Sequence, residues 1–148
     1  MDTIILTEKD FKNDVYCGKQ DLTNIQGNLR IDKAGYCRFE TYIYARGGIS
    51  ARGDISARGG ISARGGIFAK GGKLEALYGI TAGLKIYAKT TIEAGMRIFA
   101  GTAPWSWVGD EHKEIKCGKL LKGTIAYGTL IETGLPEINL SGKVVEVK

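Results

Sequence analysis

Branched aliphatic residues recur at every sixth position through the middle of the chain, and an alanine follows each of them two positions later. The first five units run from Ile43 to Gly72, and in each of them a basic residue and a glycine follow the alanine. After one extra residue near Lys73, the frame continues to Ile98-Phe99-Ala100. Residues 43–100 therefore hold ten successive units.

This period is typical of strands that coil around a narrow core. An amphipathic helix is excluded, because six steps at 3.6 residues per turn rotate a side chain by about 240°. On a strand, residues two apart share a face, so the aliphatic residue and the alanine point inward together. The glycines supply the corners between strands. The pattern predicts an all-β, single-stranded parallel β-helix, or β-solenoid. Similarity to known hexapeptide β-helices implies triangular coils of three units, with about 18 residues per turn.

The flanks follow the same plan, so we expect a single β-solenoid domain over residues 1–148. Val15-Tyr16-Cys17 and Ile115-Lys116-Cys117 repeat the frame with cysteine in place of alanine, which predicts that both cysteines fill the core. Thr7-Glu8-Lys9-Asp10 resembles a capping box and predicts a helical turn over the first coil. The expected parts are an N-terminal cap (1–14), the regular repeats (43–100), an inserted loop (101–114) and C-terminal coils (115–148).

Composition narrows the function classes. The net charge of +5 permits anionic partners. The chain lacks the roughly 20 consecutive apolar residues of a membrane span, and its start lacks a signal peptide. We therefore expect a cytoplasmic protein without membrane contact. Three widely spaced cysteines without a CxxC motif predict neither a disulfide framework nor a zinc site, and we expect no metal or cofactor.

The residue after alanine is a candidate anion-binding position. The basic residues there in the first five units are Arg46, Arg52, Arg58, Arg64 and Lys70. With about 18 residues per turn, Arg46 is expected to stack over Arg64. Arg52 is expected to stack over Lys70, with Lys89 next in that column.

Aromatic residues occupy a neighbouring column, which is expected to hold Ser50, Phe68 and Tyr87. One face would then combine cations with aromatic rings, as in surfaces that bind nucleic acid or an acidic protein. The alternative is that arginine only solubilises the chain and covers glycine-rich backbone with its long stem. A recent duplication would also copy arginine without any binding role.

The segment 101–114 interrupts the repeat and is a second candidate site. It contains Trp105, Trp107, Asp110 and His112, including both tryptophans and the one histidine of the chain. Loops on repeat scaffolds often bind partners, and tryptophan is a frequent interface anchor. Alternatively, the tryptophans fold back and seal the flank of the solenoid. We expect His112 to be a solvated loop residue.

Catalytic chemistry has little support in the sequence. The lone histidine has no serine or cysteine that the sequence places beside it, and the glycine pairs do not precede a helix, as phosphate loops do. No two carboxylates have a spacing that places them in one cleft. We therefore expect a protein that is not an enzyme, with no catalytic residues.

The run Ile49-Ser-Ala-Arg-Gly-Asp-Ile-Ser-Ala-Arg-Gly-Gly60 resembles small bacterial and bacteriophage proteins with tandem Ile-x-Ala hexads. The lead-in 7–15, the segment 27–31 and the later Ile115-Lys116-Cys117 are also similar to theirs. The resemblance covers most of the chain and implies a fold and a mobile-element setting in a bacterial host cell. Bactofilins, triangular β-helices that polymerise end to end, are a more distant likeness, and the arginine–glycine units depart from their valine- and isoleucine-rich strands.

Three functional hypotheses follow. The first is a rigid binding protein for a protein or nucleoprotein complex, and the setting that the resemblance implies suggests an inhibitor of a host defence complex, such as an anti-CRISPR protein. The second is a self-assembling, bactofilin-like structural protein that docks through an edge at 144–148. The third is direct nucleic-acid binding. We also expect a homo-oligomer, either a dimer or a polymer.

Overall fold

The computed structural model describes residues 3–102, 110–134, 136–138 and 144–146. These residues form mostly strands, which confirms the all-β prediction. Helical structure within them is limited to two short 3₁₀ turns, η1 (Glu8–Asp10) and η2 (Asp110–Lys113). None of the described helices is long and apolar enough to cross a membrane.

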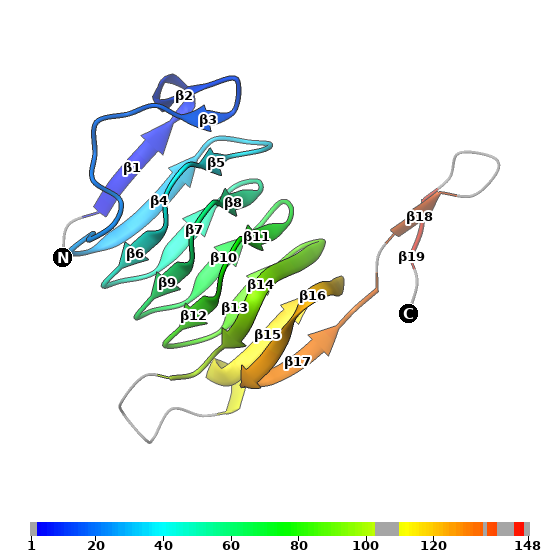
Figure 1. Cartoon of the computed structure of the whole chain (residues 1–148). Coiled ribbons are helices and arrows are strands. Elements are labelled where there is room, and N and C mark those ends of the chain that lie inside the picture. The colour runs from blue at the N-terminus through cyan, green and yellow to red at the C-terminus, as the bar shows by residue number, and fades with distance from the viewer. Residues whose placement is uncertain (1–2, 103–109, 135, 139–143, 147–148) are drawn as a thin grey trace.

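One side of the molecule is a parallel sheet of seven strands (Figure 1). In spatial order, the strands are β1 (Thr3–Thr7), β4 (Asn28–Asp32), β7 (Ile49–Ala51), β10 (Ile67–Ala69), β13 (Ile86–Ala88), β15 (Glu114–Cys117) and β17 (Thr129–Glu132). Each neighbour in this order is paired in parallel. The chain thus returns to the same sheet in the same direction along the whole molecule.

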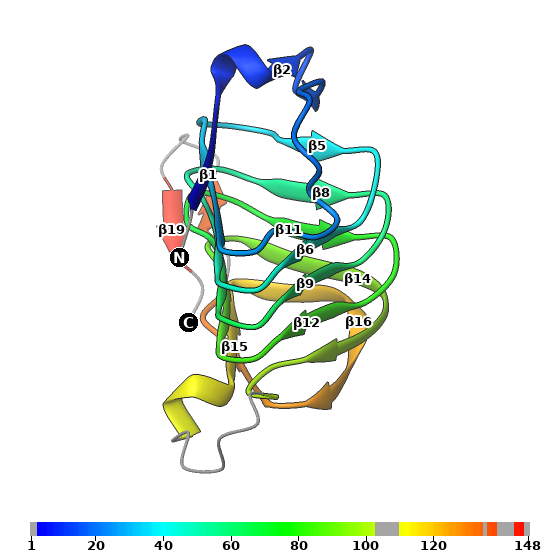
Figure 2. The ribbon, with the colours of Figure 1, turned by 90° about the vertical axis from the view of Figure 1, so that its left-hand side faces the viewer.

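Two further rows of parallel strands complete the body (Figure 2). One row contains β5 (Arg38–Phe39), β8 (Ile55–Ala57) and β11 (Leu74–Ala76), and the other contains β6 (Ile43–Ala45), β9 (Ile61–Ala63) and β12 (Ile80–Ala82). The longer strand β14 (Thr91–Phe99) pairs with β11 through its first half and with β12 through its second half. It joins the two rows into one sheet, which has ten strands with β16 (Lys119–Tyr127), the partner of β14.

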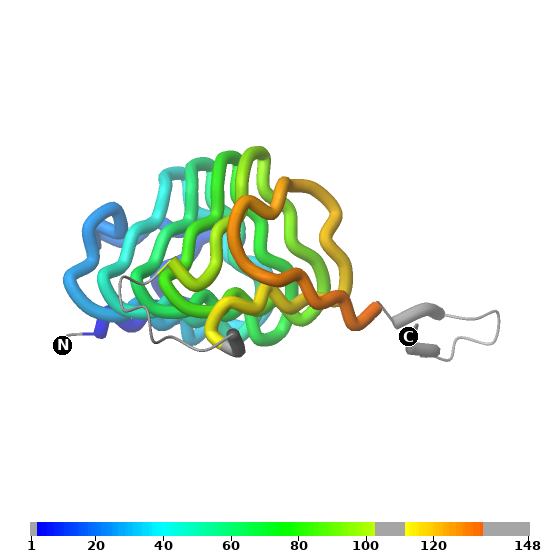
Figure 3. The backbone as a smooth tube through the Cα atoms, turned by 90° about the horizontal axis from the view of Figure 1, so that it is seen from below, coloured from blue at the N-terminus to red at the C-terminus, as the bar shows by residue number. Residues whose placement is uncertain are grey.

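The register follows the six-residue pattern. Ile49 lies opposite Ile67, which begins the third unit after it, and Ile67 lies opposite Ile86, which begins the third unit after that. The interval from Ile67 to Ile86 is one residue longer, because it contains the extra residue near Lys73. Figure 3 shows the successive passes of the chain one behind another. Equivalent unit positions are therefore neighbours in space, three units apart in sequence.

The core is a narrow stack of aliphatic residues and alanines. The first and third residues of all ten units between Ile43 and Ala100 are at most 4% exposed. Cys117 is buried as predicted, and Cys37 and Phe39 join the same core. The prediction for Cys17 is wrong, because this residue follows the terminal hairpin that ends the row of β5 and is exposed.

The N-terminal end is closed by a small hairpin of β2 (Phe11–Lys12) and β3 (Val15–Tyr16). Asn13 and Asp14 form its tip with φ angles of 53° and 65°, a left-handed conformation that Asn and Asp tolerate well. The predicted helical turn is present as η1, where the Asp10 carboxylate accepts the Thr7 N–H at 2.8 Å. Within the expected cap, β1 belongs to the seven-stranded sheet.

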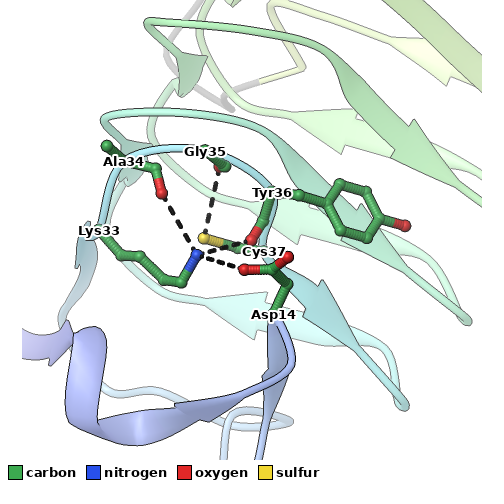
Figure 4. A network of polar contacts seen from close by, with 6 residues as sticks. All are labelled: Asp14, Lys33, Ala34, Gly35, Tyr36 and Cys37. Carbon is green, nitrogen blue, oxygen red and sulfur yellow. Dashed lines mark hydrogen bonds and ion pairs between the residues drawn. The ribbon is translucent and has the colours of Figure 1, made fainter.

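A buried lysine fastens this hairpin to the body (Figure 4). The Lys33 Nζ donates to Asp14 Oδ1 at 2.9 Å and to the carbonyl oxygens of Ala34 at 3.2 Å and Tyr36 at 2.9 Å. Lys33 is 5% exposed, so its charge depends on these three acceptors. The network makes the cap part of the folded unit.

The C-terminal coils that we expected over 115–148 continue the parallel rows only in β15, β16 and β17. The last two strands, β18 (Pro136–Ile138) and β19 (Val144–Glu146), pair antiparallel with each other in a separate two-stranded sheet. The edge that the self-assembly hypothesis used, at 144–148, is thus partly engaged by β18.

Candidate functional site

The outer side of the seven-stranded sheet, named face A here, carries one line of outward residues. The strand alternation buries the residues on either side of each of them along the regular strands. From β1 to β17 the line is Ile5, Arg30, Ser50, Phe68, Tyr87, Lys116 and Ile131. Phe68 and Tyr87 are direct neighbours in the register, which places two aromatic residues between cations.

One edge of face A is lined by cations. Arg52, Lys70 and Lys89 follow the ends of β7, β10 and β13, and all three are exposed. The Lys70 N–H donates to the Ala51 carbonyl at 3.0 Å, and the Lys89 N–H donates to the Ala69 carbonyl at 3.1 Å. This ladder sets the three side chains in the column that the sequence predicts.

The opposite edge of face A also holds cations. Arg46 and Arg64 lie at the corner that leads from β6 and β9 into β7 and β10, and the Arg64 N–H donates to the Ala45 carbonyl at 3.1 Å. Lys85 directly precedes β13, and its Nζ lies 5.9 Å from the centroid of the Phe68 ring. Such an ammonium is attracted by the aromatic face.

Positive charge on face A is largely uncompensated. The cations in its centre and edges are Arg30, Arg46, Arg52, Arg64, Lys70, Lys85, Lys89 and Lys116, and the acidic residues in the strands of this sheet are Asp32, Glu114 and Glu132. Arg52 pairs with Asp32 at 3.2 Å, and within the described residues the other seven cations form no ion pair. Like charges on adjacent strands, about 4.8 Å apart, repel by roughly 1 kcal/mol in water. The arrangement favours an anionic ligand, which would relieve this repulsion.

A hollow of about 530 Å³ opens on face A beside Ser50. Arg30, Ser50, Phe68 and Lys70 contribute to its lining, together with Thr3, Asn28, Leu29, Gly48 and Ile49. The hollow exists because a small serine stands between two large neighbours in the central line. It is therefore lined by an arginine, a phenylalanine and a lysine.

Arg58 does not belong to face A. It follows β8 at another corner of the body, where its Nη1 pairs with Glu40 Oε2 at 2.9 Å. The five basic residues of the repeat therefore lie at different corners of the body, because successive units of the chain belong to different rows of strands. Four of them border face A and Arg58 does not.

The candidates in the 101–114 segment are placed only in part. Trp105 and Trp107 lie outside the described residues. Asp110 begins η2, and His112 lies within the same turn. His112 is partly buried, so it differs from the solvated side chain that we expected.

Sequence reasoning missed a carboxylate pair. Glu75 and Glu93 are register partners on β11 and β14, and both line a hollow of about 440 Å³, so the expectation that no two carboxylates share a cleft is wrong. The Ser56 hydroxyl donates to Glu75 Oε1 at 2.8 Å and lowers the pKa of that carboxyl, whereas the hydrogen bond with Glu75 raises the pKa of Glu93. Lys73 Nζ lies 3.6 Å from Glu75 Oε2 and partly balances the charge.

A signal for this pair exists in the sequence. Both glutamates occupy the second position of their units, and the two units are three apart in sequence. Ser50 and Phe68 are separated by the same interval, and that interval is the basis for predicting the aromatic column. Ser56 and Lys73 are the local partners of the pair. Within the described part of the chain, no group of three or more His, Cys, Asp or Glu residues could hold a metal ion.

Large apolar side chains gather at the corner between the other two rows. Tyr42, Leu77, Tyr78 and Met96 are each 52–60% exposed there. The Met96 N–H donates to the Tyr78 carbonyl at 3.3 Å, which places these two on neighbouring passes of the chain. We name this surface the apolar ridge.

Comparison with known proteins adds no constraint, since no family model, curated protein or solved structure matches the chain.

Proposed function

We propose that this protein is a non-enzymatic, triangular β-solenoid that binds the sugar–phosphate backbone of nucleic acid along face A. The solenoid interpretation is supported by the return of the chain to the same row after every third unit of the repeat. The binding interpretation is carried by one observation, the gathering of eight cations and two aromatic residues on face A with a single ion pair there among the described residues.

Face A matches what an anionic chain needs. Its cations form lines along the long axis of the sheet, so consecutive phosphates of one strand would meet consecutive cations. Neutralising phosphates releases condensed counterions, which supplies affinity without reading the base sequence. Aromatic residues between the cations add the stacking surface that single-stranded nucleic acid uses.

The proposal is tested with a labelled 12-nucleotide oligothymidine and fluorescence anisotropy at low salt. The triple variant Arg52→Gln, Lys70→Gln, Lys89→Gln removes one edge of face A. The matched control replaces Lys9, Lys12 and Lys19 with Gln, which removes the same charge from exposed residues of the N-terminal segment. We expect the face A variant to bind at least about tenfold more weakly than the control. Equal affinity of both variants would contradict the proposal.

A second candidate function, protein binding, is favoured by the apolar ridge. Exposed apolar side chains that cluster at one place mark interaction surfaces, and a second copy of the chain is the partner that the expected homo-oligomer requires. Light scattering over a concentration series tests it. A dimer that Leu77→Glu dissociates would support a ridge-mediated interface, whereas a monomer at every concentration would contradict self-association. If the ridge pairs with a second copy of the chain, the protein or nucleoprotein partner of the inhibitor hypothesis would have to bind at another surface.

A further inference from the structure

The central line of face A has one gap. Ser50 stands between Arg30 on β4 and Phe68 on β10, and these three strands are direct neighbours. The backbones that carry Arg30 and Phe68 are thus two strand spacings, or about 9.6 Å, apart. A flat ring in van der Waals contact on both sides needs about 3.5–4.0 Å on each, or roughly 7–8 Å in total. The gap over Ser50 is wide enough for one planar ring.

The position of the Phe68 ring keeps one side of it open. Gly66 lies beneath the ring, since a Cβ there would meet Phe68 Cε2 at 2.6 Å. Lys85 approaches the ring from the β13 side, with its Nζ 5.9 Å from the centroid. The opposite side faces β7, where Ser50 and Gly48 line the hollow of about 530 Å³. No large side chain of β7 fills this space.

We propose that this gap, the Ser50 notch, takes one unstacked nucleobase of a single strand, between the Phe68 ring and the Arg30 guanidinium. The inference rests on the proposed function and deepens it by naming single-stranded nucleic acid as the ligand. Arginine stacks on aromatic and base planes, and Lys70 at the rim of the hollow is placed for the adjoining phosphate. The bases of a duplex are stacked within the helix and cannot enter.

Stacking in the notch is tolerant of sequence. Every base has a π-face, and a serine floor with glycine beside it offers no fixed pattern of donors and acceptors to read. The Asn28 Oδ1, also at the hollow, is already engaged by the Gly48 N–H at 2.8 Å. We therefore expect purines and pyrimidines to bind with affinities that differ less than those of single and double strands.

The test fills the notch without changing any charge. Ser50→Phe places a ring in the gap, and Ser62→Phe is the matched control, since Ser62 has the equivalent outward position in β9, opposite Tyr44. Phe68→Ala removes the stacking surface instead. The probes are a labelled 12-nucleotide oligothymidine, an abasic oligomer of the same length and a 12-base-pair duplex, compared by anisotropy, with thermal melting to show that each variant folds.

We expect Ser50→Phe and Phe68→Ala each to weaken oligothymidine binding by about 5- to 150-fold, the effect of one stacked base. Abasic binding should stay within about twofold of wild type, and Ser62→Phe should change neither. Unchanged oligothymidine affinity in folded Ser50→Phe would overturn the notch, as would a duplex that binds as tightly as the single strand. In those cases, weaker oligothymidine binding by the Arg52→Gln, Lys70→Gln, Lys89→Gln variant would still support nucleic-acid binding by face A. If wild type binds none of the probes at low salt, the proposed function itself fails.

Discussion

Phe68 and Tyr87 are cross-strand partners on β10 and β13, with their side chains side by side on the outer surface of the seven-stranded sheet. The interval between them in sequence is three units and the extra residue near Lys73. Lys70 and Lys89 follow these two strands and Lys85 precedes β13, so the aromatic pair is flanked by cations. This juxtaposition of rings and cations is the basis for proposing nucleic acid as the ligand.

Single charges on face A should each contribute to the salt dependence of binding. We expect Lys70→Gln to reduce the magnitude of the slope of log affinity against log salt by about 0.7, the share of one phosphate on a single strand. Lys12→Gln, which removes an exposed cation from the N-terminal hairpin, should leave the slope unchanged. Titrations of both variants from low to moderate salt measure the difference. An unchanged slope for Lys70→Gln would exclude this residue from the phosphate path.

The close stacking of the rows leaves no room for a side chain at Gly53. A Cβ at Gly53 would collide with the backbone nitrogen and carbonyl oxygen of Gly35, which cannot move aside as a flexible side chain would. We expect Gly53→Ala to cost about 1–3 kcal/mol and to lower Tm by roughly 2–12 °C. Gly48→Ala, whose Cβ would lie 3.2 Å from the Gly66 oxygen, should cost less. Thermal melting of the two variants measures this difference. Equal Tm values would contradict the close packing of Gly53 against the Gly35 backbone.

The regular part of the fold could be predicted because the sequence repeats its own register. Ile49, Ile67 and Ile86 are recognisable as equivalent from the sequence alone, and their parallel pairing follows. The Glu75–Glu93 pair was predictable by the same spacing and was missed because the outward positions were considered only where they were basic or aromatic.

The ends of the fold lie beyond the repeat and could not be predicted in the same way. Tyr87 pairs with Lys116 across the inserted segment 101–114, so no count of six-residue units gives this register. Cys17 follows the frame of the repeat in sequence, but Phe11 and Tyr16 pack on Phe39, with ring centroids 5.7 Å from it, and this aromatic contact accompanies an antiparallel hairpin. Local similarity to the repeat therefore predicts the direction of β3, which pairs parallel with β5, but it does not predict the exposure of Cys17.

The three cysteines should differ sharply in reactivity. Burial raises the pKa of both Cys37 and Cys117 to about 11, so their thiols stay protonated and enclosed at pH 8, whereas Cys17 is exposed. We expect about one thiol per chain to react rapidly with a thiol reagent such as Ellman's reagent, and Cys17→Ser to abolish that phase. Denaturant should expose the remaining thiols. Rapid reaction of more than one thiol in the folded protein would contradict the placement of Cys37 or Cys117 in the core.

The carboxylate pair should make stability depend on pH. The pKa of Glu93 is raised by its hydrogen bond with Glu75, so Glu93 stabilises the fold when protonated, and this contribution is lost as pH rises through its folded-state pKa. Glu93→Gln keeps a donor toward Glu75 and removes the repulsion. We expect it to raise Tm at pH 7 by a few degrees at most, since the pair is solvent-screened, and the gain should shrink as pH falls toward about 4. A gain that grows on acidification would contradict the raised pKa of Glu93.

The central claim is that face A binds a single nucleic-acid strand, and the most direct test is the affinity of the wild-type protein for a labelled 12-nucleotide oligothymidine over a salt series. The account predicts binding at low salt that weakens with a log–log slope of about −2 to −4, which corresponds to about three to six phosphates. No binding at low salt, or an affinity that does not change with salt, would contradict it.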